Sequence, residues 1–277
     1  MRSSVKTLAC RRSALKNLNV FRMSLFDALP DFFFPRDCFY CGSTLDGSRK
    51  GFICDACFEK IVFNRGICCT CCGRRLMTED AMRSDDDRLV GSDAETIVPA
   101  TVRCVNCTEL NPFFDSGISL FAFKDVGRAF IHTLKYHNGT YLRGDLQRLF
   151  MHEKERLKSL QGCIFVPVPL HFFRQWKRGY NQSDLIADAL VRCVGGKVQR
   201  LLRRSRHTPS QTNLTKAERK ENIRNAFCPR RSAKIDPHAT YVLTDDVFTT
   251  GATLNECARV LKENGATVVR IFTLAHG

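Results

Sequence analysis

Two adjacent carboxylates, Asp245 and Asp246, have the most specific chemistry in this sequence. They end an apolar stretch and are followed by a Thr-Thr-Gly turn at residues 249–251 and an amphipathic segment at residues 254–263. This order predicts a strand, an acidic tip, a hydroxyl-rich turn and a helix. Backbone N–H groups at a helix N-terminus, with threonine hydroxyls beside them, can bind a phosphate dianion. Carboxylates at the end of a strand suit ribose hydroxyls and the shell of Mg²⁺, so we expect a site for a phosphorylated ribose.

The same run has a simpler interpretation, in which an edge strand is followed by a Thr/Gly turn. Two acids directly before the turn, within a strand–loop–helix–strand pattern, favour the sugar-phosphate site. Gly251 lets the backbone approach an anion without an intervening side chain. Neither GxxxxGK[ST] nor GxGxxG, the glycine-rich patterns of other phosphate sites, occurs in the sequence.

Strand and helix patterns alternate after the cysteine-rich region and indicate how these residues are positioned. Apolar or alternating runs predict strands at residues 118–123, 163–168, 241–244 and 268–274. Helical spacing predicts helices over residues 126–138, 142–157, 183–194 and 254–263, with Ser183 as the N-cap of the third. The alternation predicts an α/β fold with a parallel sheet and helices on both faces.

Two basic segments could serve the same ligand. Residues 167–182 follow a strand and hold Arg174, Lys177 and Arg178 near a glycine turn, a composition that can bind pyrophosphate through guanidinium groups and backbone amides. Residues 203–227 are long, polar and basic, which is typical of a lid that excludes water from a labile centre. A solvated basic turn and an exposed charged connection are the alternative interpretations.

No residue is an obvious general base. Lys135 and His137 follow the first predicted helix in the segment LKYHNG, where a histidine is more simply a helix-end or surface residue. An acceptor that is already nucleophilic, such as a nucleobase nitrogen, therefore fits best.

The sequence contains 15 cysteines, and eight of them form C-x-x-C pairs before residue 110: Cys38/Cys41, Cys54/Cys57, Cys69/Cys72 and Cys104/Cys107. A two-residue gap lets both thiolates of a turn bind one tetrahedral Zn²⁺ at about 2.3 Å. Without a secretory signal, metal binding is favoured over disulfides. A catalytic thiol is the alternative, but it needs a basic partner and no histidine lies in this region. We expect two structural zinc ions.

The third pair is ambiguous because the sequence there reads CCTCC. Cys68/Cys71 is a rival to Cys69/Cys72, and the glycine that follows favours the second pair because it tolerates a left-handed turn beneath a metal. The simplest arrangement joins the first two pairs in one site and the last two in another, while an interleaved arrangement stays open. Residues 74–103 are acidic and poor in apolar residues, which predicts a solvated loop.

The formal net charge of +15 indicates a polyanionic partner: a phosphorylated substrate, nucleic acid or an anionic membrane. No apolar run reaches the ~18–20 residues of a transmembrane helix. The first 26 residues are basic, contain no acid and lack the apolar core of a signal peptide, so we expect a cytoplasmic protein. An arm without fixed structure, or sequence upstream of a start at Met23, is favoured over an organellar presequence.

Taken together, these segments resemble the ComF family, double zinc ribbon proteins with a type I phosphoribosyltransferase domain. The resemblance rests on eight segments in order: FPRDCFYCG, CDAC, CTCCG, CVNC, FKDVGRAFIHTLKYHNG, VPVPLHFFRQWKRGYNQSDLIA, TPSQTNLTKAERKENIRNAF and VLTDDVFTTGATL. It runs from about Leu25 to the C-terminus and implies a double zinc ribbon domain at residues 25–112 and a phosphoribosyltransferase domain at 113–277. The basic arm at residues 1–24 and the acidic loop at 74–103 depart from the pattern of the family.

The family binds 5-phosphoribosyl 1-diphosphate (PRPP), and the resemblance implies a role for each matching residue. Asp245 and Asp246 would hold ribose hydroxyls and help to order Mg²⁺. The residues implied for the 5-phosphate are Thr249, Thr250, Gly251, Ala252 and Thr253. Those implied for the pyrophosphate side are Pro167, Val168, Pro169, Leu170, Arg174 and Arg178, and those for the lid are Arg206, Gln211, Arg219 and Asn222.

Two classes of function follow. The leading hypothesis is a Mg²⁺-dependent phosphoribosyltransferase in which an unknown acceptor displaces pyrophosphate from C1 of the ribose. The alternative is a non-catalytic PRPP- or single-stranded-DNA-binding component of a DNA uptake or processing assembly, with a partner protein. Phe172, Phe173, Trp176 and Tyr180 lie among basic residues and could stack on bases, although ordinary packing around the loop is the favoured explanation.

Overall fold

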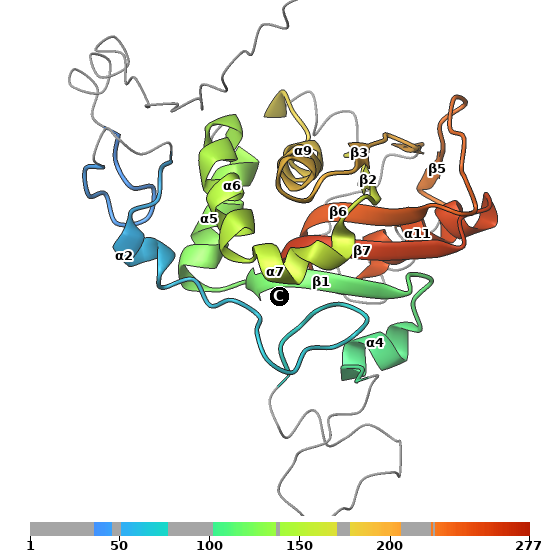
Figure 1. The fold of residues 1–277 in the computed structure, drawn as a ribbon, viewed down its shortest axis with the longest axis horizontal. Helices are drawn as coiled ribbons and strands as arrows, with labels where there is room; N and C mark the ends of the chain where they lie inside the picture. The colour runs from blue at the N-terminus through green and yellow to red at the C-terminus, as the bar shows by residue number, and fades with distance from the viewer. Residues whose placement is uncertain are drawn as a thin grey trace, which may run out of the picture.

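Figure 1 shows the fold of the chain in a computed structural model. The structure describes residues 36–45, 51–76, 102–136, 139–170, 178–205, 223 and 225–277. The basic arm, most of the acidic loop, the aromatic residues at 172, 173 and 176 and most of the lid-like segment lie outside these residues. The predictions made for those segments stay predictions.

A five-stranded sheet forms the centre of the described chain, and its neighbouring strands all pair in parallel. In spatial order the strands are β1 (Ser116–Ala122), β7 (Val268–His276), β6 (Thr240–Phe248), β2 (Ile164–Pro167) and β3 (Lys197–Val198). A separate antiparallel pair consists of β4 (Leu202–Arg204) and β5 (Phe227–Pro229). The predicted parallel sheet is confirmed.

Helices cover both faces of this sheet, as a parallel sheet requires. The longer helices are α5 (Asp125–Tyr136), α6 (Arg143–His152), α9 (Gln182–Val194) and α11 (Ala252–Glu263). The shorter ones are α2 (Asp55–Phe58), α4 (Val105–Leu110), α7 (Lys154–Leu157), η1 (Gly139–Leu142) and η2 (Lys158–Leu160). Val242 packs in one hydrophobic cluster with α5, α6 and α9, whereas Tyr241 and Leu243 pack in another with α11. Alternate side chains of β6 therefore serve opposite faces.

The strand that carries the acids is longer than predicted. The sequence pattern ends this strand at Thr244, but β6 continues because Val247 pairs with Ala275 and Phe248 with His276 of β7. The two acids consequently lie within the strand, near its carboxyl end, and not after it.

The predicted helix over residues 183–194 begins one residue earlier, with a different N-cap. Asn181, not Ser183, caps α9, because its side-chain oxygen accepts a hydrogen bond of 3.2 Å from the Ser183 backbone N–H. Gly195 ends the helix at φ 76°, as the sequence predicts.

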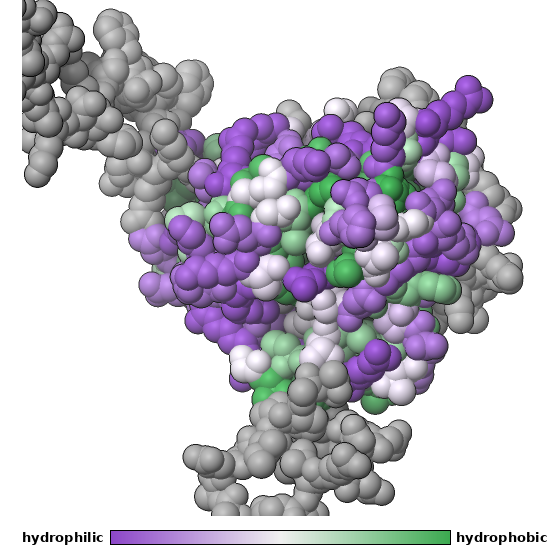
Figure 2. All heavy atoms as spheres, turned by 45° about the vertical axis from the view of Figure 1, so that its right-hand side comes forward, coloured by the Kyte–Doolittle hydropathy of each residue, from purple (hydrophilic) through white to green (hydrophobic). Residues whose placement is uncertain are grey.

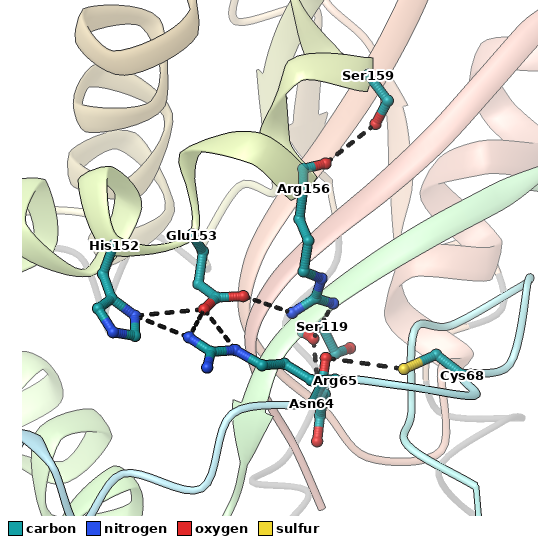
Figure 3. Close-up of polar contacts among 8 residues, drawn as sticks. All are labelled: Asn64, Arg65, Cys68, Ser119, His152, Glu153, Arg156 and Ser159. Carbon is teal, nitrogen blue, oxygen red and sulfur yellow. Dashed lines mark hydrogen bonds and ion pairs between the residues drawn. The ribbon is translucent and has the colours of Figure 1, made fainter.

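The predicted helix over residues 142–157 is divided into α6 and α7 at Glu153, whose φ of −105° departs from helical geometry. Figure 3 shows its buried carboxylate between two guanidinium groups, with Arg156 at 3.0 Å and Arg65 in direct contact. Burial opposes ionisation of Glu153, but these hydrogen bonds outweigh it and hold its pKa below the ordinary value. The network ties the segment before the second cysteine cluster to the helices on the sheet.

β1 is an edge strand, and the chain between the two cysteine clusters runs along it. The Asn64 N–H donates to the Leu120 carbonyl at 2.9 Å, and the Ala122 N–H donates to the Val62 carbonyl at 2.8 Å. These bonds cover the edge of the sheet and attach the cysteine-rich region to it.

The two cysteine clusters pack on different parts of the molecule. Cys38 and Cys57 belong to the hydrophobic cluster of α5, α6 and α9, whereas Cys72 and Cys107 belong to that of α11. In Figure 1 the first cluster lies beside α6, and the loop of the second lies beneath β1.

Asp145 of α6 anchors the first cluster to the sheet domain. Its buried carboxylate accepts hydrogen bonds from the Phe52 N–H at 2.8 Å and the Ile53 N–H at 3.3 Å. Burial raises the pKa of Asp145 to about 6 although these bonds favour its charged form.

The face drawn in Figure 2 is predominantly hydrophilic, with hydrophobic residues in small separate patches. Among the described residues, no helix combines the length and the apolar character needed to span a bilayer. A surface of this kind is normal for a protein whose apolar residues pack in two internal clusters.

Candidate functional site

A cavity of about 190 Å³ lies at the carboxyl ends of β2 and β6. Its lining combines both predicted acids, the hydroxyl-rich turn, the segment after β2 and three basic side chains. The lining residues are Lys135, Val168, Pro169, Leu170, Arg178, Gln182, Arg204, Asp245, Asp246, Val247, Phe248, Thr249, Thr250, Gly251, Ala252, Thr253 and Leu254. Acids and bases from four separate stretches of chain therefore meet at one edge of the sheet, where open α/β sheets bind ligands.

The turn between β6 and α11 has the geometry of an anion-binding loop. Gly251 adopts φ 75° and precedes the first residue of α11. A Cβ atom there would lie 2.5 Å from the Phe248 ring and 2.9 Å from Leu110, so only glycine fits both the conformation and the space. The first N–H groups of α11 have no partner within the helix and face the end at which the helix dipole favours an anion.

Asp246 is buried, and both of its carboxylate oxygens are engaged. Lys135 Nζ lies 3.2 Å from Oδ1, and Gln182 Nε2 donates a hydrogen bond of 2.9 Å to Oδ2. The carboxylate is thus held between the end of α5 and the start of α9.

Asp245 has a different environment. Its Oδ1 accepts hydrogen bonds from Ser183 Oγ at 3.2 Å and from the Asp246 backbone N–H at 2.9 Å. Burial, and then the negative charge of Asp246, raise the pKa of Asp245 from 3.8 to about 7, against the opposing effect of Lys135. The pair therefore holds less than two full negative charges near neutral pH unless a cation binds beside it.

The segment after β2 is fixed by the sheet and by α9. The Val168 N–H donates to the Thr244 carbonyl at 3.0 Å, and Asn181 Nδ2 donates to the Val168 carbonyl at 3.0 Å. Arg178 donates from Nη1 to the Gln182 side-chain oxygen at 3.0 Å and lies over the Tyr136 ring. The guanidinium of Arg178 is consequently linked by hydrogen bonds, through the side-chain amide of Gln182, to the carboxylate of Asp246.

The base of the lid-like segment is attached to α11. Ile223 and Ala226 are buried, and the Asn225 N–H donates to Glu256 of α11 at 2.7 Å. Arg204, at the end of β4, lines the cavity beside the point at which the segment leaves the described chain. The lid residues Arg206, Gln211, Arg219 and Asn222, and Arg174 of the basic loop, lie outside the described residues.

Several residues in or beside the cavity are missing from the set of ligand-binding residues predicted by sequence. Gln182 and Ser183 contact the acids, and Lys135 forms an ion pair with one of them. Lys135 lies in the last turn of α5, which ends at Tyr136. The run RGYNQS and the segment LKYHNG contain three of these residues, but only the fold reveals their contacts with Asp245 and Asp246.

The eight paired cysteines form two sets of four whose sulfurs lie within 4.8 Å of one another. The sets are Cys38, Cys41, Cys54 and Cys57, and Cys69, Cys72, Cys104 and Cys107. Four sulfurs at ~2.3 Å from a tetrahedral zinc would lie about 3.8 Å apart. The Cys41–Cys54 and Cys72–Cys104 Sγ distances, both 3.7 Å, fit this geometry. The clusters are consistent with two structural zinc ions.

Within the CCTCC run, the structure groups Cys69 and Cys72 with the last pair. The Cys104 N–H points to Cys69 Sγ at 3.3 Å, an arrangement that stabilises a metal-bound thiolate. Cys68 Sγ instead lies 3.7 Å from the Asn64 carbonyl. Each cluster joins two successive pairs, and the interleaved alternative does not occur.

A larger groove of about 540 Å³ lies between the first cluster and α6, with Phe58, Phe63, Arg65, Arg75 and His152 among its lining residues. It contains neither the paired acids nor the start of α11. The smaller cavity is therefore the one that contains the residues predicted to bind the ligand.

Comparison with known proteins agrees with this arrangement. The family described as "Double zinc ribbon domain" matches residues 29–87. Competence protein F of Haemophilus influenzae is 32% identical over 177 residues, which cover 62% of this chain and 77% of that protein. DNA utilization protein YhgH of Escherichia coli K12 is 31% identical over 185 residues, covering 64% and 80%. Competence protein ComFC of Streptococcus pneumoniae is 26% identical over 227 residues, covering 74% and 98%.

Solved structures with partial similarity include a purine phosphoribosyltransferase from Pyrococcus horikoshii and the glutamine PRPP amidotransferase of B. subtilis. The first has a TM-score of 0.31 and 15% identity over 47% of this chain and 73% of its own. The second has a TM-score of 0.29 and 19% identity over 45% and 26%. Scores this low carry no argument about function. The extent of the match to competence protein F does decide the family: this chain belongs to the ComF family.

Proposed function

We propose that this protein binds PRPP together with Mg²⁺ and acts as a phosphoribosyltransferase. The observation that carries the proposal is the convergence on one cavity of an acidic pair, a hydroxyl-bearing helix N-terminus and basic side chains. These three groups correspond to the ribose, the 5-phosphate and the diphosphate of a single ligand.

Each part of the cavity has a role in this proposal. The backbone and hydroxyls of residues 249–253 hold the 5-phosphate, and Asp245 and Asp246 hold the ribose hydroxyls. Residues 167–170 and Arg178 hold the diphosphate. The residues predicted to act with them are Arg174, Arg206, Gln211, Arg219 and Asn222. Two carboxylates beside a diphosphate are a suitable donor set for Mg²⁺, which when bound would offset charge on the leaving group.

The proposed reaction is a displacement at C1 of the ribose. The bond from C1 to the pyrophosphate oxygen breaks with its electron pair on that oxygen, a bond from the acceptor to C1 forms, and the acceptor loses a proton. Cations that hold the departing diphosphate stabilise the charge that develops on it. Among the described residues that line the cavity there is no histidine. An acceptor that is already nucleophilic, such as a nucleobase nitrogen, therefore suits the site.

The first test is calorimetric titration of the zinc-loaded protein with PRPP and Mg²⁺, beside the double variant Asp245→Asn/Asp246→Asn. We expect roughly micromolar binding by the natural protein and its loss in the variant, with unchanged zinc content. An unchanged affinity in the variant would reject the site. Release of pyrophosphate in the presence of candidate acceptors then separates turnover from binding.

A non-catalytic role in DNA handling is the second candidate, supported by the net charge of +15 and by the names of the relatives, competence protein F and DNA utilization protein YhgH. Of the four aromatic residues that could stack on bases, Tyr180 is described. Its hydroxyl donates to the Leu134 carbonyl and accepts from the Gly139 N–H at 2.9 Å, so packing occupies it. DNA binding would weaken steeply with salt, whereas PRPP binding would depend on Mg²⁺ and on the two acids.

A further inference from the structure

Lys135 occupies a position that sequence analysis does not assign to the ligand. It lies in the last turn of α5, lines the cavity, and places its ammonium 3.2 Å from Asp246 Oδ1. Its side chain is 25% exposed and that of Asp246 is 6% exposed, so the ion pair is largely withdrawn from water. Such a pair is stronger than one on an open surface, but both ions lose hydration in forming it.

Among the described residues, no cation other than Lys135 is in direct contact with Asp246. Its second oxygen accepts from the neutral amide of Gln182, and Arg178 reaches it only through that amide. Asp245 has neutral donors, Ser183 and a backbone N–H, on its Oδ1. Within the part of the chain that the structure describes, the two adjacent carboxylates therefore share one directly paired cation, Lys135.

This arrangement conflicts with direct binding of a ribose by both acids. A ribose hydroxyl that donates to Asp246 Oδ1 must share the cavity side of that carboxylate with the ammonium of Lys135. A ligand with a diphosphate group brings a greater negative charge into the same cavity. An ammonium on a flexible four-carbon chain can exchange one anionic partner for another by rotation about its side-chain bonds.

We propose that Lys135 is an exchangeable counter-ion, which pairs with Asp246 in the free protein and transfers to the diphosphate of the ligand, releasing Asp246 Oδ1 for a ribose hydroxyl. This inference rests on the proposed function, because it assumes a phosphoribosyl diphosphate in the cavity. It makes Lys135 a diphosphate-binding residue, in contrast to a permanent ion pair that only fastens the end of α5 to β6.

The exchange predicts opposite effects of one substitution on two halves of the ligand. In the full chain, Lys135→Met removes the cation while keeping an unbranched apolar side chain. We expect the affinities for PRPP and for inorganic pyrophosphate, each with Mg²⁺, to fall about tenfold or more because a charge-assisted contact is lost. The affinity for ribose 5-phosphate should stay the same or increase, since no ion pair has to be broken before the ribose binds.

Three controls accompany these titrations. Lys135→Arg keeps a cation and should restore most of the pyrophosphate affinity. Lys124→Met removes an exposed lysine just before α5, outside the cavity, and should leave all three affinities unchanged. Thermal unfolding and zinc content of each variant show that the fold is retained.

The outcomes separate this inference from the proposed function. Loss of ribose 5-phosphate affinity in parallel with PRPP affinity would show a permanent pair that organises the acids, and would overturn the exchange. Unchanged PRPP and pyrophosphate affinities in Lys135→Met would also overturn it. Failure of the natural protein to bind PRPP would instead reject the proposed function itself, and the inference with it.

Discussion

The two neighbouring acids are not equivalent residues. Asp246 is held on both oxygens by Lys135 and Gln182, whereas Asp245 is contacted on one oxygen by neutral donors. Their positions on opposite faces of β6 account for the difference, because successive side chains of a strand point to opposite sides. Asp246 consequently meets α5 and α9, and Asp245 lies where the charge of its neighbour and burial oppose its ionisation.

This difference predicts a pH-dependent effect of Asp245→Asn on stability. The folded-state pKa of about 7 exceeds the ordinary 3.8, so between these values the folded protein keeps a proton that the unfolded chain has lost. The free energy of unfolding contributed by Asp245 therefore falls as the pH rises towards 7. In Mg²⁺-free buffer, the melting temperature of the variant should exceed that of the natural protein by less at pH 5 than at pH 8. An equal difference at both pH values, measured by differential scanning calorimetry, would contradict the raised pKa.

Gly251 carries a second prediction at the scale of the residue. Gly251→Ala should destabilise the protein by about 1–3 kcal/mol and abolish PRPP binding, because its positive φ and its contact with Phe248 both exclude a Cβ atom. Gly162→Ala is the matched control, since Gly162 has φ 74° but no atom within 4 Å of a built Cβ. Denaturant titration should show a smaller loss for Gly162→Ala, and calorimetry should show unchanged PRPP affinity. If both substitutions had equal effects, the clash of a Cβ atom with Phe248 would not explain the loss at Gly251.

At the scale of the elements, the segment that follows the second cysteine cluster directly supports the turn between β6 and α11, to which we assign the 5-phosphate. Leu110, at the end of α4, lies against Gly251, and the Phe113 N–H donates to Asn255 Oδ1 of α11 at 2.6 Å. The Phe114 and Phe248 rings meet edge to face at 6.3 Å. The first cluster has no such contact among the described residues and packs on α5 and α6 instead.

Loss of zinc from the first cluster and loss of zinc from the second should therefore have different effects on PRPP affinity. Cys38→Ser and Cys104→Ser should each cost about one zinc ion, but only Cys104→Ser should weaken PRPP binding, by about tenfold or more, since a displaced loop misplaces its donors. Leu110→Ala keeps every cysteine ligand and should weaken PRPP binding with full zinc content. Metal analysis together with calorimetry tests the three variants. Equal PRPP affinities in Cys38→Ser and Cys104→Ser would contradict the support of the loop by the second cluster.

At the scale of the whole molecule, the described part of the chain, from residue 36 onward, forms a layered fold. Among these described residues, the two hydrophobic clusters draw their members from Cys38 onward. The sequence predicts no fixed structure for the basic arm before them. The domain bounds predicted at residues 24 and 112 stay predictions, although the network around Glu153 and Asp145 fastens the cysteine-rich region firmly to the sheet.

Removal of residues 1–22 should accordingly leave the melting temperature and the PRPP affinity unchanged. It should reduce binding to single-stranded DNA at low salt, because six basic residues are lost. Thermal unfolding, calorimetry and a salt series of DNA-binding measurements on the full and shortened chains compare these effects. A fall of several degrees in melting temperature would show that the arm is structural.

The sequence by itself determined the parallel α/β sheet, the acids, the Thr-Thr-Gly turn and the C-x-x-C pairs, because each follows from local patterns of residue type. Alternating or helical spacing of apolar residues indicates strands and helices, and two-residue gaps between cysteines indicate metal-binding turns. Neither inference requires knowledge of distant contacts. The ends of strands were harder to predict from the sequence. β6 extends past the acids because it pairs there with β7, and a local pattern does not show such pairing.

Only the tertiary structure decided which residues meet. The contact of Lys135 with Asp246 spans 111 positions, that of Gln182 with Asp246 spans 64, and that of Phe113 with Asn255 spans 142. A parallel sheet brings together segments that long crossover connections separate, so no local pattern encodes such pairs. The difference between the two acids and the support of the loop by the second cluster arise from these long-range contacts.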